Sequence, residues 1–138
     1  MLNFRKGFTL IELLVVIVIL SLLLSVILPV SVNTLKKYQT QEMATKVLEY
    51  INQLKGESFY KKEKKVLSSN NGKLLVNGME INKFPDVFFQ IDEPITFYEN
   101  GSCSGGVIKI FIGSYNYEIF IKQVECEISL RWIKKVFF

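Results

Sequence analysis

The stretch KGFTLIE occupies residues 6–12, and an almost unbroken apolar run follows it as far as Val30. One acidic residue, Glu12, stands at the start of that run. A charged side chain within lipid costs about 2.5–3.5 kcal/mol on insertion scales. An apolar helix that enters a membrane is expected to keep such a residue only for a purpose, so Glu12 is the first candidate functional residue.

Two common kinds of N-terminal segment fit part of this pattern. A secretory signal peptide has a basic head and an apolar core, but it ends in a small-residue cleavage site. Residues 21–31, SLLLSVILPVS, contain no alanine. A plain single-pass anchor needs about 20 apolar residues, which residues 13–32 supply, with Arg5 and Lys6 on the cytoplasmic side. Neither kind of segment gives Glu12 a role.

A short basic head, Gly7 followed by Phe8, and one glutamate in an apolar helix resemble the N-terminal signature of the type IV prepilin-like proteins. The resemblance implies that a membrane-bound prepilin peptidase cuts after Gly7 and that the new N-terminus, Phe8, is N-methylated. Phe8 and Glu12 are four residues apart and share a helix face. In an assembled filament, the resemblance places Glu12 near the amine of a neighbouring subunit's Phe8, where pairing offsets the cost of the charge.

Pro29 lies inside the apolar run, where a proline removes a helix hydrogen bond and forces a kink. Membrane helices tolerate such a residue better than soluble helices do. The resemblance implies that the helix bends or melts at Pro29 during assembly. A simpler interpretation is that Pro29 marks the point where the chain leaves the lipid.

Helical periodicity continues from Asn33 to Lys55. Its apolar stripe needs another element to cover it. The stripe comprises Leu35, Tyr38, Val47, Leu48, Ile51 and Leu54. Gly56 is predicted to cap the helix, and the charged segment 57–65, ESFYKKEKK, is predicted to be a solvated connector rather than a partner site.

Short strands are expected after the connector. Asn71-Gly72 and Asn77-Gly78 separate short apolar runs and predict hairpins. The expected strands are 66–69, 73–76, 79–81, 87–91, 95–98, 107–112, 117–121 and 126–132. The fold class is therefore α+β, with a long N-terminal helix, transmembrane in its first half, packed on a C-terminal antiparallel β-sheet domain, as in the pilin fold.

Three parts of the chain are expected. They are a prepilin leader peptide at 1–7, a long helix at 8–55 that is membrane-embedded to about residue 32, and a β-rich globular domain at 56–138. Within that domain, residues 95–121 have a Gly- and Ser-rich turn before an alternating hairpin. This arrangement resembles the GspH/FimT group of minor pseudopilins, and the resemblance weakens at QVEC, residues 123–126, where that group has a glycine-containing turn.

Cys103 and Cys126 are the two cysteines of the chain. An even pair in a segment that a membrane helix marks for export suggests one disulfide. The alternative is two unpaired thiols in a reducing compartment.

Catalytic chemistry finds little support in the sequence. The absence of histidine excludes His-based acid–base catalysis and His metal sites. No nucleophile elbow, P-loop or metal-binding spacing is present, so neither enzymatic activity nor a cofactor or metal is expected. Asp92, Glu93 and Glu99 surround a turn where calcium is conceivable, but their spacing fits no EF-hand loop, and solvated turn charges are the better interpretation.

The sequence therefore predicts a structural subunit, a minor pilin or pseudopilin of a type II secretion pseudopilus or a type IV pilus, near the filament tip. Its expected partners are other pilin or pseudopilin subunits, prepilin peptidase and an inner-membrane assembly platform. The expected location is the inner (cytoplasmic) membrane, crossed once, with the N-terminus cytoplasmic and the globular domain extracytoplasmic.

The alternative function is a competence-type minor pilin that binds DNA through Arg131, Lys134 and Lys135, because cations interleaved with aromatic residues suit single-stranded nucleic acid. The charge balance does not favour it. From Phe8 onward, 15 basic residues (17 less Arg5 and Lys6) face 13 acidic ones. The competing interpretation of this terminus is a last strand that buries Trp132 and Ile133, with the lysines in water.

Overall fold

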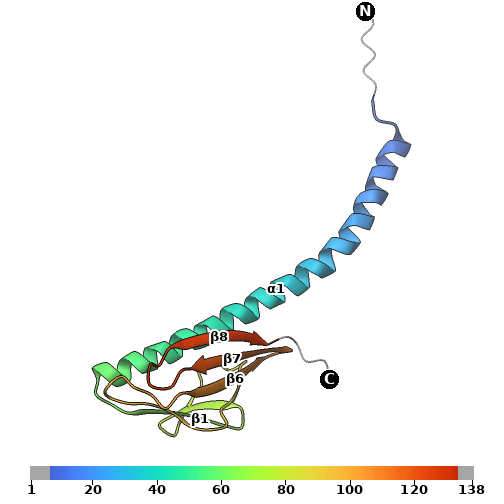
Figure 1. The fold of residues 1–138 in the computed structure, drawn as a ribbon. Coiled ribbons are helices and arrows are strands. Elements are labelled where there is room, and N and C mark those ends of the chain that lie inside the picture. The colour runs from blue at the N-terminus through green and yellow to red at the C-terminus, as the bar shows by residue number, and fades with distance from the viewer. Residues whose placement is uncertain (1–6, 134–138) are drawn as a thin grey trace, which may run out of the picture. The chain divides into compact units, whose positions relative to one another are not determined.

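The structure is a computed structural model, and it describes residues 7–133. Its fold is α+β, with one long helix and antiparallel sheets, which matches the pilin fold. The chain divides into two compact units, Met1–Tyr38 and Gln39–Phe138. The helix α1, Leu10–Tyr60, starts in the first unit and ends in the second (Figure 1).

The first unit is an apolar helical segment whose side chains are exposed. α1 is long and apolar enough to cross a membrane, as judged by length and composition. The large apolar side chains between Leu10 and Val32 lie uncovered in the isolated chain. Three serine hydroxyls in this segment each donate to a backbone carbonyl of the preceding turn, so these polar groups are satisfied within the helix. The serines are Ser21, Ser25 and Ser31.

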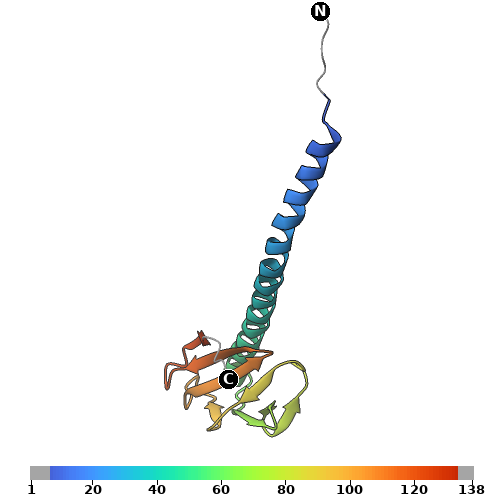
Figure 2. The same ribbon diagram turned by 90° about the vertical axis from the view of Figure 1, so that its right-hand side faces the viewer.

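The second unit combines the end of α1 with two four-stranded antiparallel sheets (Figures 1 and 2). In one sheet the strand order is β3-β2-β1-β5, and in the other it is β4-β6-β7-β8. The strands are β1 Lys65–Asn70, β2 Lys73–Val76, β3 Met79–Ile81, β4 Phe88–Gln90, β5 Ile95–Phe97, β6 Gly106–Ile112, β7 Tyr115–Ile121 and β8 Ile128–Ile133. They lie close to the strands that the sequence predicts.

The two Asn-Gly pairs form the tight turns that their chemistry favours. Asn71 and Gly72, which connect β1 to β2, have φ values of 50° and 77°. Asn77 and Gly78, which connect β2 to β3, have φ values of 52° and 80°. Two successive positive φ angles are what a two-residue type I′ hairpin requires. The local sequence therefore sets the pairing register of the first three strands.

The core lies between one face of α1 and the inner faces of the sheets. The strands β6, β7 and β8 run along the last part of α1 (Figure 1). A hydrogen bond of 3.0 Å between the hydroxyls of Thr40 and Tyr117 joins α1 to β7. Fully buried side chains of α1, β6 and β7 form the centre of this core. They are Ala44, Val47 and Ile51 of α1, Ile108 and Ile110 of β6, and Ile119 and Ile121 of β7.

The predicted end of the helix is wrong. α1 continues through Gly56 to Tyr60, because contacts of the last turn outweigh the roughly 1 kcal/mol helix penalty of one glycine. Ser58 is buried there, and its hydroxyl donates to the carbonyl of Lys55 at 2.7 Å. Lys62 supplies the left-handed cap position with φ 53°, and the Glu63 N–H donates to the Ser58 carbonyl at 3.2 Å. The first residues of the predicted connector are therefore helical.

Two further predictions about burial are wrong. Leu35 and Tyr38, predicted on the covered stripe, are 57% and 65% exposed, and the fully buried residues of α1 begin only at Ala44. Trp132, predicted to be buried with Ile133, is 50% exposed. It belongs to β8, which within residues 7–133 is an edge strand of its sheet and pairs with β7 alone.

The Gly56→Ala substitution is expected to stabilise the protein by up to about 1 kcal/mol. Gly56 has a helical conformation, and nothing lies within 4 Å of the Cβ that alanine would add. Thermal unfolding of the full-length chain in mild detergent measures the change. The control is Gly101→Ala, which is expected to destabilise because Gly101 has φ 87°. A lower melting temperature for Gly56→Ala would contradict the expectation.

Candidate functional site

The start of α1 is closed by two reciprocal hydrogen bonds. The Thr9 N–H donates to Oε2 of Glu12 at 2.9 Å, and the Glu12 N–H donates to Oγ1 of Thr9 at 3.3 Å. The Leu13 N–H completes the turn by donating to the Thr9 carbonyl at 3.2 Å. This arrangement is a capping box, in which a threonine and a glutamate three residues later satisfy backbone donors that the first helical turn leaves free.

The capping box changes how the charge of Glu12 is accommodated. Its carboxylate accepts a backbone hydrogen bond and lies at the positive end of the helix dipole, where a negative charge is favourable. Part of the cost of a carboxylate at the membrane is therefore offset within the single chain, before any neighbour is present. This capping role was not among the sequence predictions, although a threonine followed three residues later by a glutamate ahead of an apolar run is a signal for it.

Gly7 and Phe8 lie immediately before the capping box and are open to solvent. Phe8 is 83% exposed, and nothing lies within 4 Å of the position where a Cβ on Gly7 would be. The bond between them is therefore sterically accessible. Phe8 precedes Thr9 directly, so a cut after Gly7 would create a new amino terminus one residue before the capped turn.

Residues 2–28 match the model of the prokaryotic N-terminal methylation motif. The N-terminal segment is that of a type IV pilin-like prepilin. The match supports a pilin-like protein that prepilin peptidase processes, and the apolar part of α1 fits anchoring in the inner membrane. The family assembles with other pilin subunits. Neither a curated protein nor a solved structure matches the chain.

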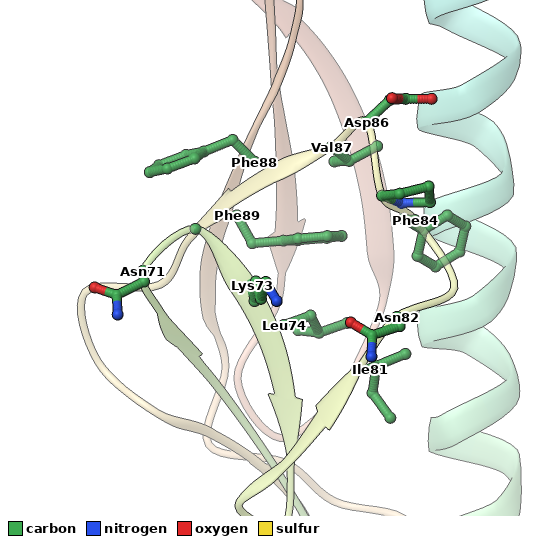
Figure 3. A pocket seen from close by; sticks show the side chains of 12 residues that line it. Asn71, Lys73, Leu74, Ile81, Asn82, Phe84, Asp86, Val87, Phe88 and Phe89 are labelled. Atoms are coloured by element: carbon green, nitrogen blue, oxygen red, sulfur yellow. The ribbon is translucent and has the colours of Figure 1, made fainter.

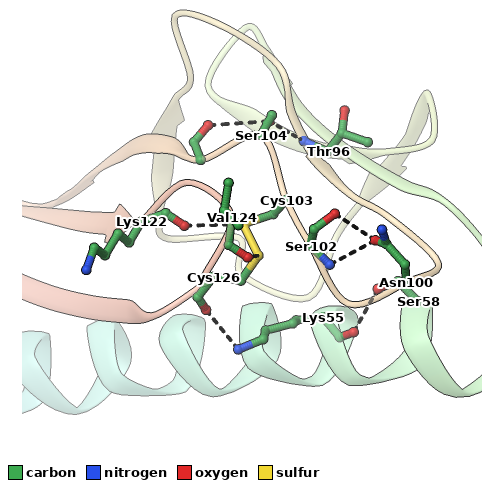
Figure 4. The surroundings of a disulfide bond; sticks show 11 residues. Lys55, Ser58, Thr96, Asn100, Ser102, Cys103, Ser104, Lys122, Val124 and Cys126 are labelled. Atoms are coloured by element: carbon green, nitrogen blue, oxygen red, sulfur yellow. Dashed lines mark hydrogen bonds between the residues drawn. A yellow bond between two sulfur atoms is a disulfide. The ribbon is translucent and has the colours of Figure 1, made fainter.

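The cysteine pair of the pilin-like chain is bonded, as the sequence suggested. The disulfide Cys103–Cys126 joins the segment after β5 to the loop before β8 (Figure 4). A cross-link over 23 residues contributes about 3 kcal/mol in the chain-entropy model. Both cysteines are buried next to α1, where the Lys55 ammonium donates to the Cys126 carbonyl at 2.8 Å.

The carboxylates near residue 95 do not converge on one point. Asp92 accepts hydrogen bonds from Gln90 at 3.0 Å and from Lys109 at 3.3 Å. These two contacts, the Gln90 bond first, lower the pKa of Asp92 below its usual value. Within residues 7–133, no group of three Cys, His, Asp or Glu side chains could hold a metal ion.

Of the predicted DNA contacts, Lys134 and Lys135 lie outside the described residues, and Arg131 already has protein neighbours. Its guanidinium lies 5.8 Å from the centroid of the Phe120 ring. In the strand register Arg131 is opposite Glu118, a cross-strand position where opposite charges attract. This setting does not favour a phosphate contact.

A hollow of about 270 Å³ opens beside the β1–β2 turn (Figure 3). The ring of Phe88 lies over Gly72, where a Cβ would come within 2.2 Å of it. The polar side chains that line the hollow, such as Asn71, Asn82 and Asp86, are exposed to solvent. Specific ligand sites need polar groups that converge in a shielded pocket, and this hollow does not provide them.

The Thr9→Val substitution is expected to loosen the first turn of α1. Valine keeps the shape but cannot accept the hydrogen bond from the Glu12 N–H, a loss of about 1 kcal/mol for a cap. Hydrogen exchange of the Glu12 amide, followed in detergent micelles, should speed up about fivefold. Thr9→Ser, which keeps the hydroxyl, is the matched control and should exchange like the original chain. Equal exchange in Thr9→Val and Thr9→Ser would contradict a role for the box.

Proposed function

We propose that the chain is a structural subunit, a minor pilin or pseudopilin of a type II secretion pseudopilus or a type IV pilus, placed near the filament tip. The observation that carries the proposal is a capped, acidic helix start within a matched N-terminal methylation motif, on a helix with uncovered apolar side chains. The minor role and the tip position rest on the resemblance of residues 95–121 to the GspH/FimT group. Before assembly the subunit spans the inner membrane once, with the N-terminus cytoplasmic and the second unit extracytoplasmic.

Processing prepares the helix start for assembly. Cleavage after Gly7 exposes an ammonium group on Phe8, and methylation keeps that group positively charged. In the capping box Oε2 of Glu12 accepts the Thr9 N–H, and within residues 7–133 no hydrogen bond is made to the other carboxylate oxygen, so that oxygen can accept a cation. In a filament, Glu12 pairs with the Phe8 ammonium of a neighbouring subunit. Such an ion pair is strong where water is excluded, and it rewards one register of one helix beside another.

The apolar surface of α1 drives the packing of subunits against one another in the filament. In the membrane, lipid covers the side chains from Leu10 to Val32, and in the filament the helices of neighbouring subunits replace the lipid. Leu35 and Tyr38, which are exposed, continue this apolar surface beyond the predicted membrane segment. Burial of these two side chains against a neighbour would add about 1.5–3 kcal/mol each, and this contribution becomes available on assembly.

Glu12→Leu is expected to leave membrane insertion intact and to reduce incorporation into filaments, because the ion pair with Phe8 is lost. Incorporation is measured as the amount of subunit in sheared filaments relative to the membrane fraction. Glu12→Gln serves as a second variant, since glutamine can still complete the capping box but carries no charge. Both variants should be depleted from filaments. Normal levels of the Glu12→Leu subunit would show that the ion pair is not needed.

Gly7→Val is expected to block processing, because a branched side chain takes the place of the glycine at the cut. Mass spectrometry of the protein purified from membranes should show the original chain without residues 1–7 and with one added methyl group on Phe8. The Gly7→Val chain should keep residues 1–7. Recovery of the original protein with its first seven residues intact would overturn the proposed processing and, with it, the proposed function.

A further inference from the structure

The loop between β7 and β8 holds a β-branched residue in a strained conformation. Val124 has φ 69°, and the Glu125 N–H donates to the Gln123 carbonyl at 2.8 Å. This bond closes a three-residue turn with a positive φ at its centre, which is the rare and strained form of that turn. A branched Cβ makes the left-handed region still less favourable. Glycine or asparagine would adopt the same φ far more readily.

The strain persists because the loop is held from two sides (Figure 4). The disulfide to Cys103 and the Lys55 ammonium both anchor Cys126, the second residue after Val124. The Val124 N–H donates to the Cys103 carbonyl at 3.2 Å. Gly105 lies so close that a Cβ on it would come within 2.8 Å of the loop backbone. These contacts fix the backbone of the loop, so its conformation does not need the side chain of Val124.

The side chain of Val124 makes no contribution to the core that would explain its presence. It is 67% exposed. The flanking Lys122 and Glu125 form an ion pair of 2.6 Å. The exposed Val124 side chain, here called the apolar tip, therefore lies beside two side chains whose opposite charges are paired. An apolar centre with a polar rim is the composition of a protein contact. The contacts of the loop impose the backbone conformation but do not require valine there, and strain that persists at such a position is often kept for function.

We propose that Val124 is a contact residue that packs against an apolar surface of a neighbouring pilin-like subunit in the filament. The inference rests on the proposed function, which supplies the neighbour. The flanking charges cancel, so the tip suits an apolar protein surface rather than a polyanion such as DNA. The clamped loop presents the side chain in one orientation, which reduces the entropy lost on binding.

The proposal predicts opposite effects of one substitution on stability and on assembly. Val124→Asn relieves the strain and removes the apolar tip. The melting temperature of the full-length chain in detergent should rise by about 3 °C. Incorporation into sheared filaments should fall about tenfold, the loss expected when one buried valine side chain is removed from a contact. Lower incorporation therefore cannot come from a weakened fold.

Three control variants separate the possible causes. Val124→Ile keeps a branched apolar side chain and should assemble like the original chain. Lys62→Gly relieves a positive φ of 53° at the end of α1 and should raise the melting temperature without changing assembly. Glu12→Leu tests the proposed function in the same assay, because it removes the charge at the helix start and leaves the loop untouched.

Each outcome decides between the two proposals. A stabilised Val124→Asn chain that assembles normally, while Glu12→Leu is depleted, would overturn the contact but keep the proposed function. If Val124→Asn does not raise the melting temperature, Val124 is not strained, and the inference is wrong. Normal assembly of Glu12→Leu would instead count against the proposed function. Depletion of Val124→Asn with a raised melting temperature, together with normal assembly of Val124→Ile and Lys62→Gly, supports the contact.

Discussion

A carboxylate held at the start of an apolar helix is the interaction on which the proposed biology of this chain depends. Glu12 accepts the Thr9 N–H and receives the benefit of the helix dipole, so a single subunit can tolerate its charge at the membrane. Among residues 7–133 only Oε2 of this carboxylate accepts a hydrogen bond, and the proposed filament partner of Glu12 is the Phe8 ammonium of a neighbouring subunit. Under the proposed function, Glu12 thus has a partner within the isolated subunit and a charged partner after processing.

The second unit shows how the far end of the same helix is used. From Ala44 onward one face of α1 is buried against β6 and β7, and Lys55 and Cys126 connect the helix to the loop before β8. The disulfide and this hydrogen bond hold a backbone that local preferences alone disfavour at Val124. The helix therefore begins with one proposed assembly contact, Glu12. Near its end it holds the loop that carries the other proposed contact, Val124.

Much of the fold follows from local chemistry. The apolar run predicts the membrane-compatible helix, and the Asn-Gly pairs at 71–72 and 77–78 predict tight hairpins because asparagine and glycine accept positive φ. The strand boundaries agree closely with alternation in the sequence. The Thr9–Glu12 capping box is equally local and could have been predicted from its spacing. The family match of the N-terminal segment falls in this same region, over residues 2–28.

The sequence by itself determined the type and approximate position of each element, because periodicity and turn residues act over a few neighbours. Tertiary structure decided where α1 ends, since burial of Ser58 and the cap at Lys62 outweigh the preference of Gly56. It also decided that Ala44 is buried in the core while Trp132 of β8 is exposed. Tertiary contacts likewise set the backbone at Val124. These outcomes depend on contacts between segments far apart in the chain, and the free energy of such contacts cannot be read from local spacing.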